Sequence, residues 1–385
     1  MKIWIVNPFD NLPLEGYRPM RYWLMASAFA KAGCDVTYWT ADFSHANKAP
    51  RRLSAAPGQV AAPFRLRILH EPPYTRNVSL ARMWAHWRWA KEWRRAAAAE
   101  RPPDVVVVST PPLAIGGEVR KYAARTGAKV VVDVMDDWPG TFERVAPGFA
   151  LQPLRALARR NVRAAAAVTV VADRYADLVR DYGFAGPVKR FYHGIAMDGP
   201  APSARAAGAP LRLAYIGSLG RTYDLKTVIE ALALLPGATL DVAGEGEQLE
   251  SLKALGSSAR FHGYLPEAEL ARLLSECDVG IVPMEQASCV GVPYKFADYA
   301  RAGLAIASSL GGESGRLLAR YDAGVAYRGG DPMSLAAALR SVASRLPAVS
   351  AASRRMAEAE FDAGAIYSSY VDFTSKLARG EGFGE

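Results

Sequence analysis

The sequence is poor in cysteine and has no long apolar run. Its 385 residues include three cysteines, Cys34, Cys277 and Cys289, without CxxC spacing or a neighbouring histidine cluster. This pattern argues against a disulfide framework or a zinc site and favours a reducing compartment such as the cytosol. No apolar stretch reaches the roughly 18 residues that a membrane-spanning helix needs. The N-terminal MKIWIVNPFDN predicts a first β-strand and not a signal peptide.

Several nucleotide-binding and nucleic-acid-binding motifs are also missing. Neither GxGxxG nor a Walker motif occurs, so a dinucleotide site or a P-loop has little support. No standard nucleic-acid-binding motif occurs either, and a basic α/β protein that binds nucleic acid is therefore kept only as an alternative.

The net charge of +9 is unevenly distributed. Residues 1–200 contain 29 Lys/Arg and 17 Asp/Glu, whereas residues 201–385 contain 18 and 21. Such asymmetry indicates an anionic surface as partner of the basic half, either a membrane or a nucleic acid. An Arg-rich and Ala-rich composition that reflects genomic bias is the alternative explanation.

The order of the predicted elements indicates two α/β domains. A single core rarely grows beyond about 250–300 residues, so a chain of this length is expected to divide. Strand-like runs rich in β-branched residues alternate with helical segments in residues 1–198 and again in residues 211–358. The Pro/Ala/Gly/Ser-rich residues 199–210 between them predict a linker. The rhythm predicts two Rossmann-like, doubly wound domains with parallel sheets.

Ligands of such sheets bind beyond the carboxyl ends of the strands, and two facing sheets would place a substrate cleft between the domains. After the first strand, Gly16 precedes a helix with Arg18 and Arg21 nearby. Backbone N–H groups there suit a phosphate or a sugar oxygen, although an ordinary tight turn is the simpler interpretation.

Loops of the second domain offer more candidates for donor binding. YIGSLGRTYDLK places Gly217, Ser218 and Arg221 directly after a strand, with Lys226 close behind. Glycines allow close backbone approach, and the cations would neutralise a diphosphate. Lys226 alone is more often a solvated helix charge.

Two further loops are weaker candidates. Gly244 and Glu245 end the next strand, where they suit a sugar hydroxyl or form a plain turn. Tyr264 follows another strand and suits a base edge.

The stretch Met284 to Ser309 is the most informative. Gly291 and Val292 precede a predicted helix in which Lys295 and Asp298 lie three residues apart, on one face. At a helix N-terminus this pair suits a diphosphate and a ribose diol. As an isolated pair it would be a surface ion pair.

These motifs, in this order, resemble the donor domain of GT-B glycosyltransferases, family 4 in particular. The resemblance rests on AGEG, FHGYLP, DVGIVPM and the VPYKFADYARAG helix. VVVDVMDDWPGTF is similar to the D-x-x-D-x-W-P segment of the bacterial branch that builds surface polysaccharides, and YHGIAMD to the N-G-V-D element before the linker. The similarity covers nearly the whole chain. It implies that the helix in residues 359–385 returns to the first domain.

The family differs from this sequence at its E-x7-E pair. Asp298 occupies the second position, and Val290 stands where the first carboxylate would be. Backbone amides of Gly291 and Val292, or the Glu285 side chain, are candidates to replace it.

The resemblance implies transfer from a nucleotide diphosphate sugar (UDP-, GDP- or dTDP-) with retention at the anomeric carbon. No metal or other cofactor is expected, because Arg221, Lys226 and Lys295 would stabilise the leaving group. Asp136 and Asp137, in a carboxylate cluster with Asp133, are the catalytic candidates. A metal-binding role of this cluster is the rival interpretation.

We therefore expect a cytoplasmic glycosyltransferase that works peripherally at the inner face of the plasma membrane. Its acceptor would be a lipid-linked or nascent glycan in cell-surface polysaccharide biosynthesis, such as lipopolysaccharide. A sugar-nucleotide epimerase or a synthase with a soluble product is the alternative, and no nucleic-acid partner is expected.

The stretch RMWAHWRWAKEWRR, Arg82 to Arg95, contains four of the eight tryptophans. A helical wheel places Trp84 and Trp87 on one side and Trp89 and Trp93 roughly opposite. This arrangement predicts one buried pair, with the other free to meet a membrane interface. Burial of both pairs is the alternative.

Overall fold

The computed structural model describes residues 1–53, 62–143, 146–198, 209–256, 258–285 and 290–382. Residue contacts divide the chain into two units. Unit 1 comprises Met1–Gly194 and Gly364–Glu385, and unit 2 comprises Ile195–Ala363. Most of the predicted linker, residues 199–208, lies outside the described residues.

Unit 1 is built on a seven-stranded sheet in the order β5-β2-β1-β6-β7-β8-β9, and every pair is parallel. The strands are β1 (Lys2–Val6), β2 (Asp35–Ala41), β5 (Arg65–Leu69), β6 (Val105–Thr110), β7 (Lys129–Val134), β8 (Ala167–Val170) and β9 (Val188–Arg190). A small antiparallel hairpin, β3 (Phe43–Ser44) and β4 (Ala49–Pro50), follows β2.

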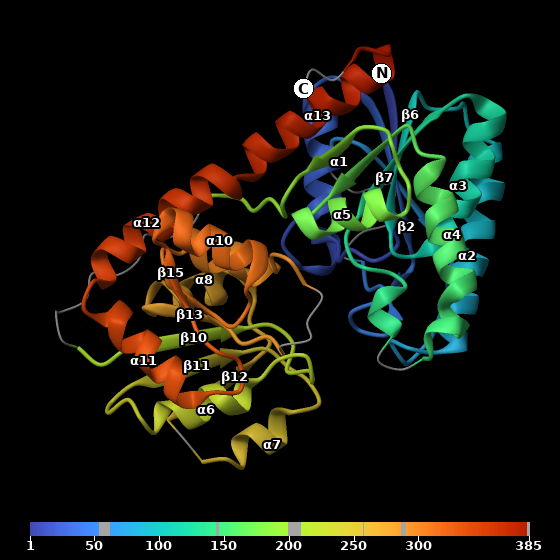
Figure 1. The fold of residues 1–385 in the computed structure, drawn as a ribbon. Coiled ribbons are helices and arrows are strands. Elements are labelled where there is room, and N and C mark those ends of the chain that lie inside the picture. Colours follow the sequence, from blue (N-terminus) through green and yellow to red (C-terminus); the bar gives the residue numbers. More distant parts are fainter. Residues whose placement is uncertain (54–61, 144–145, 199–208, 257, 286–289, 383–385) are drawn as a thin grey trace. The chain divides into compact units, whose positions relative to one another are not determined.

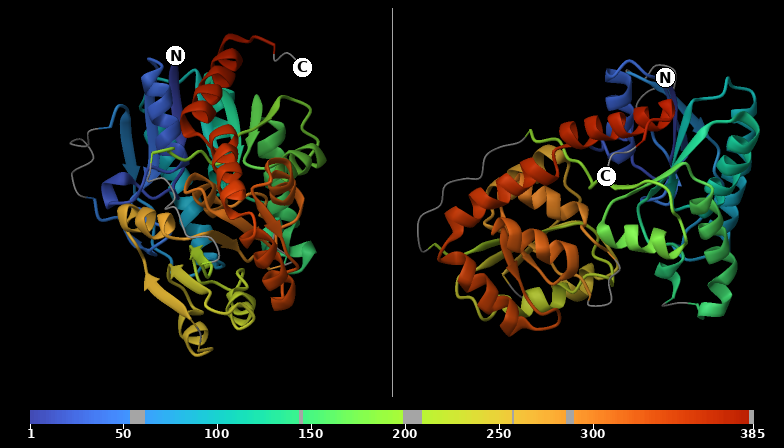
Figure 2. Two further views of the ribbon diagram at one scale, coloured as in Figure 1. Left: turned by 90° about the vertical axis from the view of Figure 1, so that its left-hand side faces the viewer. Right: turned by 45° about the horizontal axis from the view of Figure 1, so that its top comes forward.

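Helices cover both faces of this sheet (Figures 1 and 2). They are α1 (Arg21–Lys31), α2 (Leu80–Ala98), α3 (Leu113–Thr126), α4 (Gln152–Arg163), α5 (Asp173–Asp181) and α13 (Ala363–Arg379), with the short 3-10 turns η1 (Pro13–Glu15), η2 (Gly140–Phe142) and η3 (Gly148–Leu151). Trp4 and Val6 pack into one core with α2 to α5. Phe29 of α1 and Tyr370 of α13 meet with ring centroids 6.2 Å apart. The C-terminal helix therefore belongs to unit 1.

A buried ion pair joins these elements. The Arg21 guanidinium donates two hydrogen bonds of 2.8 Å to the Asp133 carboxylate, and neither side chain is exposed. The hydroxyls of Tyr22 and Thr169 also donate to Asp133, and the Thr169 hydroxyl lies 3.0 Å from that of Tyr370. Arg21, which the sequence places near Gly16, and Asp133, the first member of the predicted carboxylate cluster, therefore neutralise each other inside the sheet-helix interface.

Unit 2 contains a six-stranded parallel sheet in the order β12-β11-β10-β13-β14-β15. Its strands are β10 (Arg212–Ile216), β11 (Thr239–Ala243), β12 (Ala259–Gly263), β13 (Val279–Val282), β14 (Ala305–Ser308) and β15 (Gly324–Ala326). Its helices are α6 (Leu225–Leu232), α7 (Leu249–Lys253), α8 (Glu267–Ser275), α9 (Tyr294–Arg301), α10 (Gly312–Tyr321), α11 (Pro332–Ala343) and α12 (Leu346–Glu360). The prediction of two doubly wound α/β units is confirmed.

The Arg21–Asp133 pair gives a first testable prediction. Asp133→Asn leaves a buried guanidinium without its counter-charge, which should lower the free energy of unfolding by about 3–5 kcal/mol. Urea denaturation measures this change. The exposed Asp372→Asn on α13 is the matched control and should unfold like the wild type. Equal stability of Asp133→Asn and wild type would contradict the buried pair.

Candidate functional site

Three loops meet at the carboxyl ends of β10, β11 and β12. Gly217 N–H donates to the Ala243 carbonyl (2.9 Å), and Gly244 N–H donates to the Gly263 carbonyl (2.7 Å). A Cβ atom at Gly244 would overlap the carbonyl of Gly217, and one at Gly246 would meet the backbone of Leu219. Only glycine permits this approach, so the backbone itself forms the surface at this end of the sheet.

The order of strands in unit 2 changes direction between β10 and β13. Here the two strands pair only at Leu213–Val279 and Ala214–Gly280. Further along, the hydroxyl of Tyr299 replaces the backbone hydrogen bonds between β10 and β13. It accepts from Ile216 N–H (2.9 Å) and donates to the Ile281 carbonyl (3.2 Å). The strands therefore separate at the point where doubly wound sheets bind their ligands.

Lys295 lies one helical turn before Tyr299, on the same face of α9. Its side chain is only 6% exposed, and Nζ lies 4.0 Å from the ring centre of Tyr215 and 3.8 Å from that of Tyr223. A Cβ atom at Gly217 would lie 3.1 Å from Nζ, so the amine sits directly against that backbone. No described residue accepts a hydrogen bond from Nζ. Burial holds the pKa of Lys295 well below its usual value of 10.5, although nearby Asp298 opposes the shift.

The neighbours of Lys295 on α9 are also buried. Asp298 is 2% exposed, and Gly291 and Val292 lie buried just before the helix. The Gly291 carbonyl accepts from the Ser314 hydroxyl (2.6 Å) and so fixes the approach to α9. Glu285, by contrast, is exposed and bonds to the loop after β10 through its N–H. Residues 286–289, with Cys289, lie outside the described residues.

The other predicted donor residues of unit 2 lie at the surface. Arg221 is 87% exposed beside Glu247, and Lys226 is 67% exposed beside Glu230, one turn along α6. Ser218, Glu245 and Tyr264 are exposed too. The structure therefore groups Gly217, Gly244 and Lys295 closely, while Arg221 and Lys226 occupy solvated positions.

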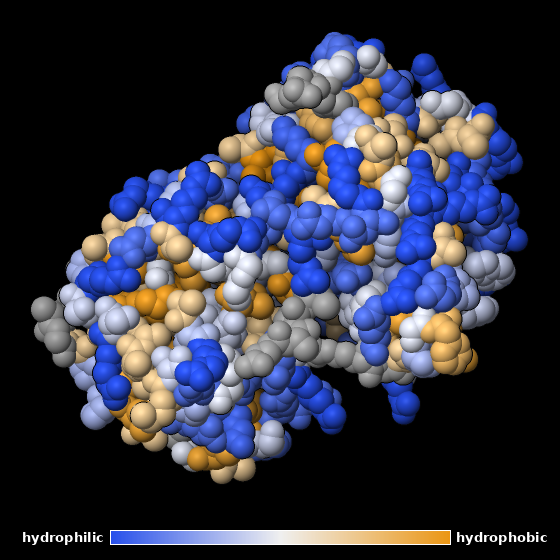
Figure 3. Space-filling model, in the orientation of Figure 1, coloured by the Kyte–Doolittle hydropathy of each residue, from blue (hydrophilic) through white to orange (hydrophobic). Residues whose placement is uncertain are grey.

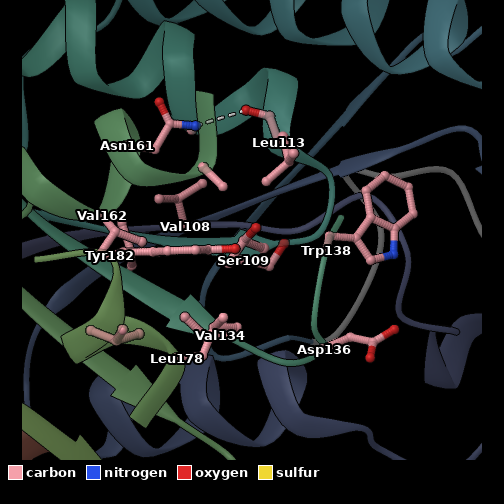
Figure 4. Close-up of a pocket in the computed structure, with 15 residues that line it drawn as sticks. Val108, Ser109, Leu113, Val134, Asp136, Trp138, Asn161, Val162, Leu178 and Tyr182 are labelled. Atoms are coloured by element: carbon pink, nitrogen blue, oxygen red, sulfur yellow. Dashed lines mark hydrogen bonds between the residues drawn. The ribbon is translucent and has the colours of Figure 1, made fainter. Parts of the chain in front are cut away.

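In unit 1, the predicted catalytic loop follows β7. Asp137 N–H donates to the Asp136 carboxylate (2.8 Å), and burial raises the pKa of Asp136. Asp136 and Trp138 lie on one side of a small pocket, opposite Val162 and Tyr182 (Figure 4). The pocket volume of about 20 Å³ corresponds to about one water molecule.

Arg82 is a functional candidate that the motifs did not reveal. It is 7% exposed, and its guanidinium lies 4.7 Å from the Trp138 ring and 5.4 Å from the Phe9 ring. Its Nε donates to His86 (3.3 Å). The first turns of α2 therefore hold the loops that follow β1 and β7. Only the sequence position of Arg82, at the start of the Trp-rich helix, could have drawn attention to it.

Glu71 completes this cluster. Its side chain is 1% exposed and its two carboxyl oxygens make no hydrogen bond to any described residue. Burial raises its pKa to about 8. His86 Nε2 lies 4.0 Å away, and burial lowers the pKa of that imidazole to about 2. A neutral carboxyl and a neutral imidazole thus surround Arg82.

The loop after β1 has a structural role at Gly16. This glycine has a left-handed conformation (φ 82°) and donates to the Pro13 carbonyl as it ends η1. Arg51 ties the same loop down through bonds to the carbonyls of Pro8 and Asp10. Gly16 is thus placed in a tight turn, the simpler of its two interpretations. Among the described residues, no group of three or more His, Cys, Asp or Glu is arranged to hold a metal.

Two family profiles match the chain. "Glycosyl transferase 4-like domain" matches residues 21–194, and "Glycosyl transferases group 1" matches residues 210–345. Glycogen synthase of Mycobacterium tuberculosis is 32% identical over 155 residues. That alignment covers 37% of this chain and 36% of the curated relative, so it spans about a third of either protein.

Solved structures match over the full length. Sucrose-phosphate synthase of Thermosynechococcus elongatus has a TM-score of 0.78 at 16% identity and covers 99% of this chain and 100% of its own. HepE of Anabaena, in complex with UDP-glucose, has a TM-score of 0.68 at 13% identity, and the match covers 98% of this chain and 99% of HepE. WaaG, a glycosyltransferase involved in lipopolysaccharide biosynthesis, has a TM-score of 0.64 at 15% identity, and the match covers 96% of this chain and 99% of WaaG. This chain belongs to the GT-B glycosyltransferases, with family-4-like domains.

The Trp-rich stretch forms α2, with one buried and one exposed tryptophan pair. Trp89 and Trp93 are fully buried, whereas Trp84 is 54% and Trp87 is 49% exposed. Arg88 lies over the ring of Trp84 and Lys91 over that of Trp87. The predicted division into two opposite pairs is confirmed, and the burial of all four tryptophans is excluded.

Glu71 should make one pH-dependent contribution to the stability of the protein. Its folded-state pKa of about 8 exceeds the ordinary value of 4.5, so unfolding releases a proton between these values. The stability contributed by the protonated carboxyl is therefore lost as pH rises from about 5 to 8, by about 4 kcal/mol at most.

Urea denaturation at pH 5 and pH 8 tests this linkage. The free energy of unfolding of Glu71→Gln, taken relative to the wild type, should rise by up to about 4 kcal/mol from pH 5 to pH 8, because this difference cancels the opposing contribution of buried neutral histidines such as His86. The exposed Glu230→Gln should behave like the wild type. If the difference between Glu71→Gln and the wild type were the same at pH 5 and at pH 8, the raised pKa of Glu71 would be contradicted.

Proposed function

We propose that the protein transfers a sugar from a nucleotide diphosphate sugar to a lipid-linked or nascent glycan, with retention at the anomeric carbon. In this proposal, unit 2 binds the donor and unit 1 binds the acceptor. The observation that carries it is Lys295, a buried amine without a hydrogen-bond acceptor among the described residues, at the point where β10 and β13 separate. A buried ammonium group is unfavourable unless it is paired, so an anionic ligand at this position would stabilise its charged form.

A diphosphate fits the groups that surround Lys295. The backbone of Gly217 and Gly244 admits a bulky anion closely, and the N-terminus of α9 favours negative charge. When the bond between the sugar and the diphosphate breaks, charge develops on the leaving oxygen. Lys295 and the helix N-terminus would stabilise that charge, and we propose that no metal ion is needed.

Asp136 and Asp137 are the proposed contacts to the acceptor or to donor hydroxyls. Asp136 is largely buried, and its raised pKa suits a carboxyl that exchanges protons with a hydroxyl. Asp298 is the proposed partner of the ribose diol, with backbone N–H groups of Gly291 and Val292 near the site of the absent first carboxylate.

Similar structures support the donor class and the pathway. HepE has been solved with UDP and with UDP-glucose, and WaaG acts in lipopolysaccharide biosynthesis. By analogy, we propose a UDP-, GDP- or dTDP-sugar as donor and a cell-surface polysaccharide as product.

We also propose that the protein works at the anionic inner face of the plasma membrane. Trp84 and Trp87 present amphipathic rings beside Arg88 and Lys91, a combination typical of a membrane interface. Hydrophilic side chains dominate the surface over α3 and α4 (Figure 3). Three arginines of α4 are exposed there, Arg159, Arg160 and Arg163. No helix of the described residues has the length and apolarity of a membrane span.

Nucleotide binding tests the central proposal. In a thermal-shift panel of UDP, GDP and dTDP, at least one should stabilise the wild type. Lys295→Ala should weaken the binding of that nucleotide about tenfold or more, because a charge-assisted contact of about 1.5–3 kcal/mol is lost. The exposed Lys253→Ala on α7 is the control and should bind normally. If none of the three nucleotides shifted the wild type, the transferase proposal would fail.

Liposome co-sedimentation tests the membrane proposal. The wild type should bind anionic vesicles and dissociate at high salt, since screening weakens the basic contribution. Trp84→Ala combined with Trp87→Ala should reduce binding several-fold, whereas Met333→Ala, which removes an exposed side chain of unit 2, should not. Unchanged binding of the double variant would place the membrane contact elsewhere. Binding of DNA or RNA in place of vesicles would contradict the proposal.

A further inference from the structure

Tyr215 and Tyr223 enclose Lys295 from two sides. Tyr215 lies on β10 and is fully buried, while Tyr223 lies in the loop that follows β10. The rings contact each other at 70° with centroids 5.8 Å apart, and Nζ lies within 4.0 Å of both ring centres. The Tyr215 hydroxyl donates to the Ser218 carbonyl (2.6 Å), and neither tyrosine hydroxyl forms a hydrogen bond with Nζ.

The loop that carries Tyr223 is fixed to the loop after β13. Asp224 N–H donates to the Pro283 carbonyl (2.8 Å), and Glu285 N–H donates to the Thr222 carbonyl (3.1 Å). Tyr223 and Met284 form an isolated antiparallel bridge between the same loops. The ring of Tyr223 is therefore held over Lys295 by backbone bonds and not by side-chain packing alone.

The two rings shield the amine from water but supply no negative charge. Burial raises the pKa of both tyrosines, so they stay uncharged near neutral pH and supply only ring faces. Asp298 is the carboxylate whose charge favours the ammonium form, and Tyr299 packs one turn along the same helix. Ring faces attract a cation by about 2 kcal/mol when desolvated, which offsets only part of the cost of burying a charge.

We propose that Tyr215 and Tyr223 form an aromatic clamp that positions Lys295, and that Lys295 takes up a proton from solvent when a nucleotide diphosphate binds. The proton moves to Nζ as the diphosphate supplies the missing negative charge, and it returns to solvent when the nucleotide leaves. The tyrosines are positioning residues, since they act through Lys295. This inference rests on the proposed donor site and adds its coupling to pH.

Isothermal titration calorimetry measures this coupling. The probe is whichever of UDP, GDP and dTDP gives the largest thermal shift. It is titrated at pH 8, where a terminal phosphate with a pKa of about 6 is ionised. Titrations in phosphate and in Tris, which differ in ionisation enthalpy, yield the number of protons taken up. The wild type should take up a measurable fraction of a proton, at most about one per nucleotide.

Three variants separate the clamp from a general structural role. Lys295→Arg carries a permanent charge and should bind without proton uptake. Tyr223→Phe keeps the ring and should match the wild type in affinity and in proton uptake. Tyr223→Leu removes the ring face and admits water, so it should bind about tenfold to thirtyfold more weakly and take up less of a proton.

The outcomes distinguish this inference from the donor proposal. If none of the nucleotides bound the wild type, the donor proposal itself would fail. If a nucleotide bound without proton uptake, or with the same uptake in Lys295→Arg, the coupling would be overturned. Equal affinity of Tyr223→Leu and Tyr223→Phe would overturn the clamp. The proton-uptake test uses the wild type and Lys295→Arg and does not depend on the folding of Tyr223→Leu, and a thermal-unfolding transition like that of Tyr223→Phe shows that Tyr223→Leu is folded.

Discussion

The position of one buried amine constrains the rest of unit 2. Lys295 reaches the end of the sheet only because β10 and β13 separate there and the Tyr299 hydroxyl satisfies the backbone groups that this separation leaves. The separation in turn requires Gly280, since a Cβ atom at that residue would collide with the ring of Tyr299. Lys295 and Asp298, which in isolation would be a surface ion pair, are therefore buried at the place where we propose that the donor binds.

Each unit buries a basic side chain, but only unit 1 pairs it directly with a carboxylate. In unit 2 the amine of Lys295 is buried without a hydrogen-bond acceptor among the described residues, and backbone from glycine-containing loops lies against it. In unit 1 the buried Arg21 is fully paired with Asp133, and the pair ties α1, β7, β8 and α13 together. A paired buried charge indicates architecture, whereas an unpaired one indicates function.

Periodicity and composition predicted most of the fold, because long runs of β-branched residues alternate with amphipathic helices. The strand β5 was missed, since RLRIL is short, carries two arginines and lies at the edge of the sheet. The site could be predicted only in part. Sequence spacing identified Lys295 and Gly217, but it could not separate the buried Arg21 from the exposed Arg221, because pairing and burial depend on tertiary contacts.

The central claim is that the diphosphate of a donor binds between Lys295 and the Gly217 backbone. A crystal structure of the protein with the nucleoside diphosphate that stabilises it most tests this claim directly. We expect a phosphate oxygen within hydrogen-bond distance of Lys295 Nζ, at the carboxyl end of β10. A nucleotide bound in unit 2 with its diphosphate on the exposed Arg221 and Lys226, and Lys295 still enclosed by Tyr215 and Tyr223, would contradict it.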